Sequence, residues 1–181
     1  IVSGQVLQCP YDFQKARLVV REMADALALD LVDKGLVTNQ LVLTVGYDRE
    51  NLDDPSRRQS YRGPVTTDRY GRKIPKHAVG TENFPYTSSA SDLLKAVTAL
   101  YDRIVDKNLL IRRLSISANK LLPEVDVPKD EAEQLDLFTD YAAKEQQEQA
   151  DKAAHARERK LQEAMLGIKK RYGKNAILKG M

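Results

Sequence analysis

The residues of this 181-residue chain best suited to binding chemistry begin with two arginines, Arg112 and Arg113. Ser115, Ser117 and Asn119 follow at every second position, with apolar residues between them. A period of two places these polar side chains on one face of a β-strand. Guanidinium and hydroxyl groups on a rigid strand suit phosphate oxygens and need no base identity. The pattern favours contact with a nucleic-acid backbone, and the alternative is a solvated sheet face whose arginine pairs with a nearby acid.

A second signal is the pentapeptide Gln134-Leu135-Asp136-Leu137-Phe138, a large apolar pair within an acidic stretch. Exposed apolar groups lower solubility, so docking into a partner is one physical reason for them. Gln134 would then orient the peptide at the rim of a pocket. The alternative is that Leu135, Leu137 and Phe138 pack on the chain's own surface.

Catalytic chemistry has little support in the sequence. The candidate residues are His77, His155, Cys9, Asp48, Glu50, Asp53 and Asp54. The two histidines lie far apart in the sequence, and the single cysteine falls in an expected strand. The four acids lie in a segment whose sequence is typical of a turn. No glycine-rich phosphate loop is present. We therefore expect a non-catalytic chain without metal or cofactor, and one cysteine favours a reducing, cytoplasmic setting.

The charge of the chain is divided into blocks. Residues 1–120 carry 18 Lys and Arg against 14 Asp and Glu, residues 121–151 carry 2 against 10, and residues 152–181 carry 9 against 2. One basic cluster consists of Arg57, Arg58, Arg62, Arg69, Arg72, Lys73 and Lys76. Such polarity is typical of a domain that faces a polyanion, followed by an acidic linker and a basic tail.

The elements that must position these residues follow from periodicity and punctuation. Strands are predicted at 5–9, 41–47, 79–84 and 111–119, and helices at 12–34 and from Ser89 or Ser91 to about 104. Residues 48–76 are interpreted as a long loop or a ragged hairpin. The order β-α-β-β-α-β predicts an α+β fold, a four-stranded sheet with two helices on one face. The other face is in water and carries Thr44, Arg113, Ser115, Ser117 and Asn119.

Three regions result: a domain at 1–122, an acidic linker at 123–138 and a helical basic tail at 139–181. Apolar residues are sparse in the tail until Leu161, Met165, Ile168 and Tyr172, which predicts a solvated or partner-dependent helix. A mean hydropathy of -0.49 and the lack of an 18-residue apolar run exclude a membrane-spanning helix. The chain begins at Ile1, so we expect it to come from a longer protein.

Several segments carry a resemblance to a known family. They are Ser3–Leu7, Cys9–Phe13, Gly80-Thr81 with Thr87–Ser89, Ile111–Leu114 and the ending Ile168–Asn175. These segments resemble the little-finger (polymerase-associated) domain of Y-family translesion DNA polymerases, of the UmuC/ImpB/MucB/SamB type. The pentapeptide is similar to the bacterial sliding-clamp-binding motif Gln-Leu-x-Leu-Phe. The β-α-β-β-α-β order agrees with the family's little finger.

The resemblance implies a grip on duplex or primer-template DNA and recruitment by the bacterial sliding clamp, in translesion synthesis and DNA repair of the SOS type. The implied DNA contacts are Arg112, Arg113, Ser115, Ser117, Gly80 and Thr81, to which the open face adds Thr44 and the basic insert adds Arg72 and Lys73. The implied clamp contacts are Gln134, Leu135, Leu137 and Phe138. The family's palm motifs are missing from this sequence, so the polymerase's magnesium is expected in the parent protein, which would act in the bacterial cytoplasm at the nucleoid.

Two other classes of function remain open from the sequence. A β-α-β-β-α-β unit also serves as a ligand-sensing regulatory domain, although no apolar pocket signature accompanies it. An RNA-binding module is the other alternative, and the lack of outward aromatic residues on the predicted strands argues against base stacking there.

Overall fold

The structure is a computed structural model that describes residues 1–127, 141–173 and 176–177. Its strands are β1 (Val2–Tyr11), β2 (Leu36–Tyr47), β3 (Val65–Thr67), β4 (Lys73–Pro75), β5 (Ala78–Thr87), β6 (Ile111–Asn119) and β7 (Leu122–Pro123). Its helices are α1 (Phe13–Asp33), α2 (Glu50–Asp53), α3 (Pro55–Ser60), α4 (Ala90–Ile104) and α5 (Tyr141–Tyr172), with a 3₁₀ turn η1 (Glu124–Asp126).

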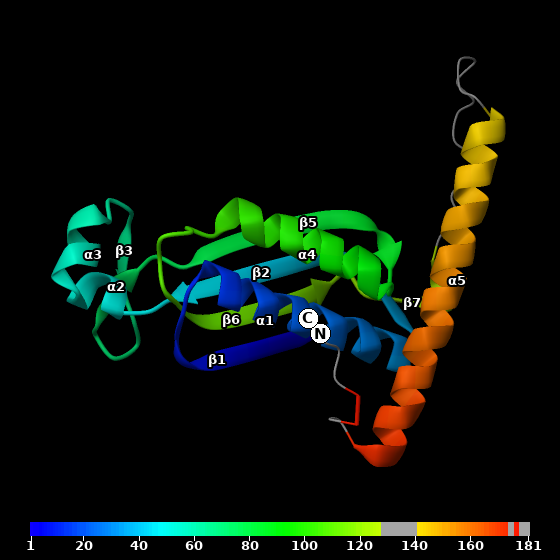
Figure 1. The fold of residues 1–181 in the computed structure, drawn as a ribbon, viewed down its shortest axis with the longest axis horizontal. Coiled ribbons are helices and arrows are strands. Elements are labelled where there is room, and N and C mark those ends of the chain that lie inside the picture. Colours follow the sequence, from blue (N-terminus) through cyan, green and yellow to red (C-terminus); the bar gives the residue numbers. More distant parts are fainter. Residues whose placement is uncertain (128–140, 174–175, 178–181) are drawn as a thin grey trace.

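The main sheet has the strand order β1-β6-β2-β5, and its neighbouring strands are antiparallel. Helices α1 and α4 lie side by side on one face of this sheet (Figure 1). The predicted α+β class, with two helices on one face of a four-stranded sheet, is confirmed. The short strand β7 adds a further pairing to the beginning of β2.

The two covering helices begin and end where the sequence places their caps. The Oδ1 atom of Asp12 accepts a hydrogen bond of 2.8 Å from the amide of Lys15, which caps α1. Gly35 follows the helix with φ of +63°, a conformation that favours glycine. Ser89 caps α4 by accepting a bond from the amide of Asp92. These capping signals set where the two helices begin and end. The lengths of the helices in turn set how much of the sheet they cover.

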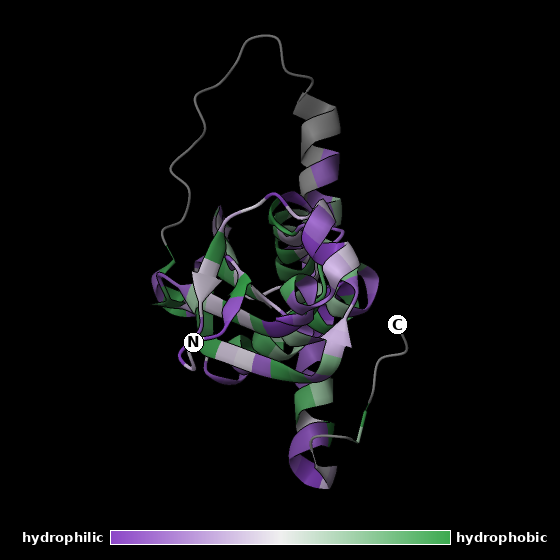
Figure 2. Ribbon diagram, turned by 90° about the vertical axis from the view of Figure 1, so that its left-hand side faces the viewer, coloured by the Kyte–Doolittle hydropathy of each residue, from purple (hydrophilic) through white to green (hydrophobic). Residues whose placement is uncertain are grey.

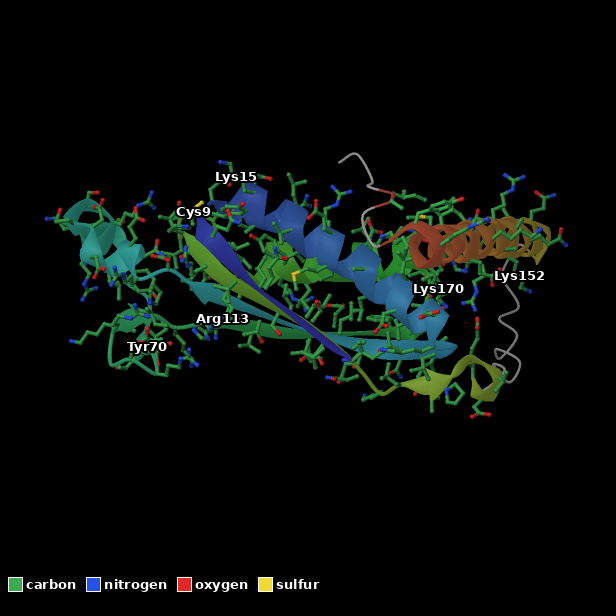
Figure 3. The ribbon with its side chains drawn as sticks, turned by 90° about the horizontal axis from the view of Figure 1, so that it is seen from below. Cys9, Lys15, Tyr70, Arg113, Lys152 and Lys170 are labelled. Carbon is green, nitrogen blue, oxygen red and sulfur yellow. The ribbon has the colours of Figure 1, made fainter. Side chains whose placement is uncertain are left out.

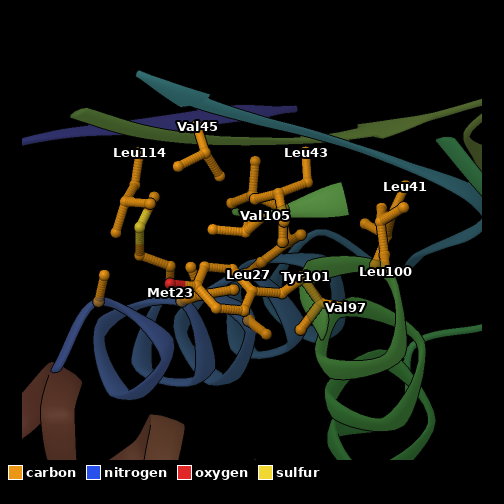
Figure 4. Packing of buried hydrophobic residues seen from close by; sticks show 14 of the residues in the cluster. Met23, Leu27, Leu41, Leu43, Val45, Val97, Leu100, Tyr101, Val105 and Leu114 are labelled. Atoms are coloured by element: carbon orange, nitrogen blue, oxygen red, sulfur yellow. The ribbon is translucent and has the colours of Figure 1, made fainter. Parts of the chain in front are cut away.

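The core lies between the sheet and the two helices. Figure 4 shows sheet residues facing helix residues across this layer, among them Leu43, Val45, Leu114, Leu27, Val97 and Tyr101. The Tyr101 hydroxyl donates a hydrogen bond of 2.9 Å to the carbonyl of Phe13, which joins α4 to the start of α1. Burial raises the pKa of Tyr101 above its ordinary value. One sheet face is therefore used for the core, and the other is not covered by α1 or α4.

The segment between β2 and β5 is more ordered than predicted. It contains α2, α3 and the two-stranded sheet of β3 and β4, at the end of the domain that is on the left in Figure 1. Asn51 is buried and anchors this segment, because its side chain bonds the carbonyls of Asp48 and Leu110 and accepts a bond from the amide of Leu110, each at 2.8 Å. The insert is thus fixed to the start of β6.

Helix α5 is largely exposed where its side chains are described, as expected of a solvated helix, but it also packs on the domain. Much of it is hydrophilic (Figure 2), and its contacts are correspondingly polar. The Glu158 carboxylate accepts bonds from the Ser89 hydroxyl at 2.8 Å and from the Ser91 amide at 2.7 Å. Arg159 pairs with Glu124 at 2.9 Å. These contacts join α5 to the start of α4 and to η1.

The apolar stripe of α5 is buried at one of its four residues. Met165 and Gln162 are buried, and the Gln162 amide donates a bond of 3.1 Å to the Ser88 carbonyl. Leu161, Ile168 and Tyr172 are exposed. The exposure of these three residues agrees with the expectation of a solvated or partner-dependent helix, whereas the hydrogen bonds and ion pairs that join α5 to the domain were not predicted.

Docking of α5 should weaken in acid. Burial raises the pKa of Glu158, but the bonds from Ser89 and Ser91 outweigh it and hold the pKa below the usual 4.5. A depressed folded-state pKa stabilises the docked form above pH 4.5, and this stability is lost as the pH falls through the lower folded-state value. We expect the protection factors of the α5 amides in hydrogen exchange, which correct for the intrinsic pH dependence of the exchange rate, to fall below pH 4.5.

In Glu158→Gln the loss of α5 docking in acid should disappear. Glu163→Gln, which removes an exposed carboxylate on the same helix, should keep the wild-type loss. A Glu158→Gln protein with the wild-type dependence on pH would contradict the role of this carboxylate.

Candidate nucleic-acid interface

The face of the sheet away from the helices is lined by short side chains in aligned rows. The register pairs Gly4 with Ser115 and Ser115 with Thr44, so these positions share a face. The residues that the strand pairing places on this face are Val2, Gly4, Val6, Arg113, Ser115, Ser117, Asn119, Gln40, Val42, Thr44, Gly46, Val79, Thr81 and Asn83. We call this surface the open face. It brings together five of the predicted DNA contacts, which are Thr44, Thr81, Arg113, Ser115 and Ser117.

The side chains of Arg112 and Arg113 have different contacts, although the sequence groups the two residues and both line the cleft described below. Gly46 pairs with Arg113 and Tyr47 pairs with Ile111, so Arg112 is an extra residue in β6. Such a bulge re-aims a side chain. The Arg112 guanidinium donates a bond of 2.9 Å to the Gln8 carbonyl and lies 3.8 Å from an Asp48 oxygen. Arg113 belongs to the open face and is exposed, whereas Arg112 is engaged within the chain.

Gly80 lies on the opposite face from its neighbour Thr81. It pairs with the buried Leu43, and a Cβ atom at Gly80 would lie 2.7 Å from Leu100 Cδ1 and 2.8 Å from Ile104 Cγ2. This glycine therefore lets α4 pack closely on β5. The predicted DNA contact at Gly80 has no support from its position.

A valine at Gly80 should destabilise the domain because it overpacks the contact with α4. We expect Gly80→Val to lower the free energy of unfolding in urea by about 1–3 kcal/mol. Gly4→Val is the matched control, since a Cβ there is 3.9 Å or more from its neighbours. Equal stabilities of the two variants would show that β5 and α4 are not in close contact.

Amide side chains occupy the end of the open face that is far from Arg113. Gln40 donates a bond of 2.8 Å to Asn83, and Asn119 donates one of 3.4 Å to Gln40. The Ser117 hydroxyl donates a bond of 2.9 Å to Asn119. These bonds cross three strands and leave the face rigid, with hydroxyl and amide groups at one end and a guanidinium at the other.

The other two predicted contacts, Arg72 and Lys73, lie on the insert. Arg72 pairs with Asp68 at 2.8 Å, and Lys73 is exposed at the start of β4. A cleft of about 910 Å³ separates the β3–β4 hairpin from the end of the open face. Arg113 and Gly46 line its sheet side, and Arg72 lines its hairpin side. The basic insert is thereby joined to the open face, a connection that no local sequence signal gives.

The charge at this end of the sheet is mixed but leaves cations available. Among the cleft residues, Arg49 pairs with Asp53 and Arg72 with Asp68. In the part of the chain that the structure describes, Arg113 and Lys76 have no carboxylate within ion-pair distance. These two cations can meet phosphate without first breaking an ion pair.

Other predicted features of the chain are placed as follows. The clamp-motif residues Gln134, Leu135, Leu137 and Phe138 lie outside the described residues. Cys9 is exposed on the edge strand β1. Within residues 1–127 and 141–173, no group of three His, Cys, Asp or Glu side chains is placed to hold a metal ion. None of the helices in the same ranges is long and apolar enough to cross a membrane.

Comparisons with known proteins identify a family, and they find solved structures with a similar fold. Residues 8–137 match the model of the impB/mucB/samB family C-terminal domain. The structure is similar to one described as a complex of the beta-clamp processivity factor and the little finger domain of PolIV, with a TM-score of 0.41 and 8% sequence identity. That similarity covers 77% of this chain and 98% of the other. A search among curated proteins found no match.

Proposed function

The chain belongs to the impB/mucB/samB family C-terminal domain, since the family model spans residues 8–137, and we propose that it is the DNA-gripping and clamp-tethering region of a Y-family polymerase. In this proposal the open face contacts the phosphates of duplex or primer-template DNA. The region itself is non-catalytic, and the parent polymerase acts in translesion synthesis during the SOS-type damage response in the bacterial cytoplasm.

The observation that carries the DNA proposal is the composition of the open face. Small residues occupy much of this face, so a nucleic-acid backbone can approach the sheet closely. They are Gly4, Thr44, Thr81, Ser115 and Ser117. Hydroxyl groups and the Arg113 guanidinium are donors to phosphate oxygens, and such contacts position a protein on DNA without reading its sequence. The open face has no aromatic residue among its aligned positions, which favours duplex backbone over stacked, unpaired bases there.

The clamp proposal rests on the sequence of residues 134–138. Leu137 and Phe138 provide two large apolar side chains next to each other, and a hydrophobic pocket on a partner would bury them. The segments on either side, η1 and α5, are joined by the Arg159–Glu124 ion pair. A clamp bound between them would therefore stay close to the DNA-binding domain.

The family's polymerase chemistry needs paired metal ions held by carboxylates. The described residues do not fit that group, because no three potential ligands lie together in them. We accordingly place magnesium and nucleotidyl transfer in the parent polymerase and assign neither to this chain.

The experiment that tests the DNA proposal is a titration of duplex DNA at several salt concentrations. Phosphate contact releases counterions, so the logarithm of affinity should fall linearly with the logarithm of salt, by about 0.9 for each phosphate neutralised. Affinity that is independent of salt, or confined to one base sequence, would remove the proposed mode of binding.

A further inference from the structure

The tip of the β3–β4 hairpin exposes a tyrosine between two arginines. Tyr70 has 64% of its surface exposed, although tyrosine is usually at least partly buried. The guanidinium carbons of Arg69 and Arg72 lie over its ring, 4.7 Å and 4.9 Å from the ring centre. Three planar groups are thus gathered at one exposed point of the molecule, and we call them the Tyr70 platform.

The turn beneath the Tyr70 platform is held by Asp68. Its Oδ1 atom accepts bonds from the amides of Tyr70 at 2.8 Å and Arg72 at 3.0 Å, and its Oδ2 atom accepts one from Arg72 Nε at 2.9 Å. Gly71 provides the left-handed residue of the turn, with φ of +77°. The bond from the Arg72 amide, followed by those from the Arg72 side chain and the Tyr70 amide, outweighs the effect of burial and holds the pKa of Asp68 below its usual value. The turn is therefore ordered without any ligand.

The Tyr70 platform faces the end of the open face across the cleft of about 910 Å³. Figure 3 shows Tyr70 and Arg113 on the same side of the molecule, away from the helices. His77 and Arg113 lie close together over Gly46, where a Cβ atom would lie 3.2 Å from Arg113 Cβ and 3.6 Å from His77 Nε2. One side of the cleft thus supplies stacking surfaces, and the other supplies the guanidinium of Arg113, while the carboxylates of Asp48, Glu50 and Asp53 also line the cleft.

We infer that this cleft binds an unpaired stretch of DNA next to the duplex on the open face, with a base stacked on the Tyr70 platform and phosphates at Arg113 and Lys76. Aromatic rings and guanidinium planes stack on bases that are free of a duplex. The cleft volume is within the range of about 300–1,000 Å³ that holds molecules of nucleotide size, and a double helix is far wider.

This inference rests on the proposed function, because the duplex on the open face brings the unpaired strand to the cleft. The Tyr70 platform nevertheless contributes a separate kind of contact, with bases instead of phosphates. The two kinds of contact can be measured separately, since one needs only a duplex and the other needs an overhang.

The test compares a blunt duplex with the same duplex carrying a single-stranded overhang that contains 2-aminopurine. We expect the overhang to raise affinity about tenfold, a typical effect of one stacked base, and the 2-aminopurine fluorescence to be quenched on binding. Tyr70→Ala should remove both effects and leave blunt-duplex affinity unchanged. Tyr70→Phe should retain them, because it keeps the ring.

Tyr172→Ala is the matched control, since Tyr172 on α5 is 68% exposed and has the Arg171 guanidinium 5.5 Å from its ring centre. It should behave as the wild type. If blunt duplex binds but the overhang adds nothing, or if an overhang of abasic sites adds as much, the cleft inference fails and the proposed function stands. Equal loss of affinity in the two tyrosine variants would also overturn it. Absence of any duplex binding would refute the proposed function itself.

Discussion

Arg113→Glu is expected to lower the affinity of the chain for duplex DNA by at least tenfold. Arg113 lies on the open face, is exposed, and has no carboxylate within ion-pair distance in the described part of the chain. Replacing it removes a cation and places an anion where phosphate would lie. The salt slope should also become shallower by about 0.9, the contribution of one phosphate contact. Fluorescence anisotropy across a salt series measures both quantities.

Two control variants separate this contact from the general charge of the chain. Lys95→Glu makes the same change of charge on α4, which covers the other face of the sheet, and should have a much smaller effect. Arg112→Ala should reduce binding less than Arg113→Ala, because the Arg112 guanidinium is engaged with Gln8 and Asp48. Equal losses of DNA affinity in Arg113→Glu and Lys95→Glu would show that the chain and DNA attract each other through overall charge, without a defined site. That result would exclude the open face as the interface.

The stability of Arg113→Glu should be close to that of the wild type. The side chain is exposed and makes no hydrogen bond within the described residues, and such surface substitutions usually change stability by less than about 0.5 kcal/mol. A loss of binding can therefore be attributed to the lost contact. Urea unfolding of the two proteins checks this point.

Local sequence signals predicted the fold well because each reports a short-range preference. The period of two from 111 to 119 matches β6, and Asp12 and Ser89 cap the two helices as expected. The alternation also predicted that Ser115 and Thr44 share the open face, which the register bears out. The family match over residues 8–137 confirms the resemblance read from the motifs.

The different contacts of Arg112 and Arg113 could not be predicted, because alternation assumes an unbroken ladder. The bulge arises where β6 meets the end of β2, and its cause is a pairing between strands that are far apart in sequence. The position of Gly80 against α4 could not be predicted for a similar reason. Its closeness to α4 depends on packing between layers, and a lone glycine in a strand does not indicate which face is crowded.

Polar tertiary contacts explain the remaining differences. The insert is anchored by the amide of Asn51, and α5 is docked by Glu158, Arg159 and Gln162. Hydrophobic periodicity cannot detect interfaces made of hydrogen bonds and ion pairs. The exposed Tyr70 could not be predicted from the strands, because it lies in the turn between β3 and β4, within the segment interpreted as a loop. A Tyr-Gly turn flanked by arginines within a basic cluster would have been the signal for it.

Leu137→Ala together with Phe138→Ala is expected to abolish binding to a sliding clamp while leaving DNA binding intact. Burying a side chain of this size contributes about 1.5–3 kcal/mol, so loss of both should weaken a clamp complex by about a hundredfold or more. Gln134 should contribute through amide hydrogen bonds, whereas Asp136 should point to solvent. Asp136→Ala is thus the control within the same pentapeptide, and it should bind the clamp as the wild type does.

The decisive measurement combines both ligands, because tethering to an encircling clamp raises the local concentration of the DNA-binding domain to about millimolar. On DNA with a loaded clamp, the wild-type chain should bind far more tightly than on bare DNA. The Leu137→Ala, Phe138→Ala double variant should bind bare DNA and clamp-loaded DNA with the same affinity, which should equal that of the wild type on bare DNA. The Arg113→Glu variant should keep its affinity for the free clamp, since the open face and the pentapeptide are separate sites. If the double variant gained as much from the loaded clamp as the wild type, residues 134–138 would have no part in tethering.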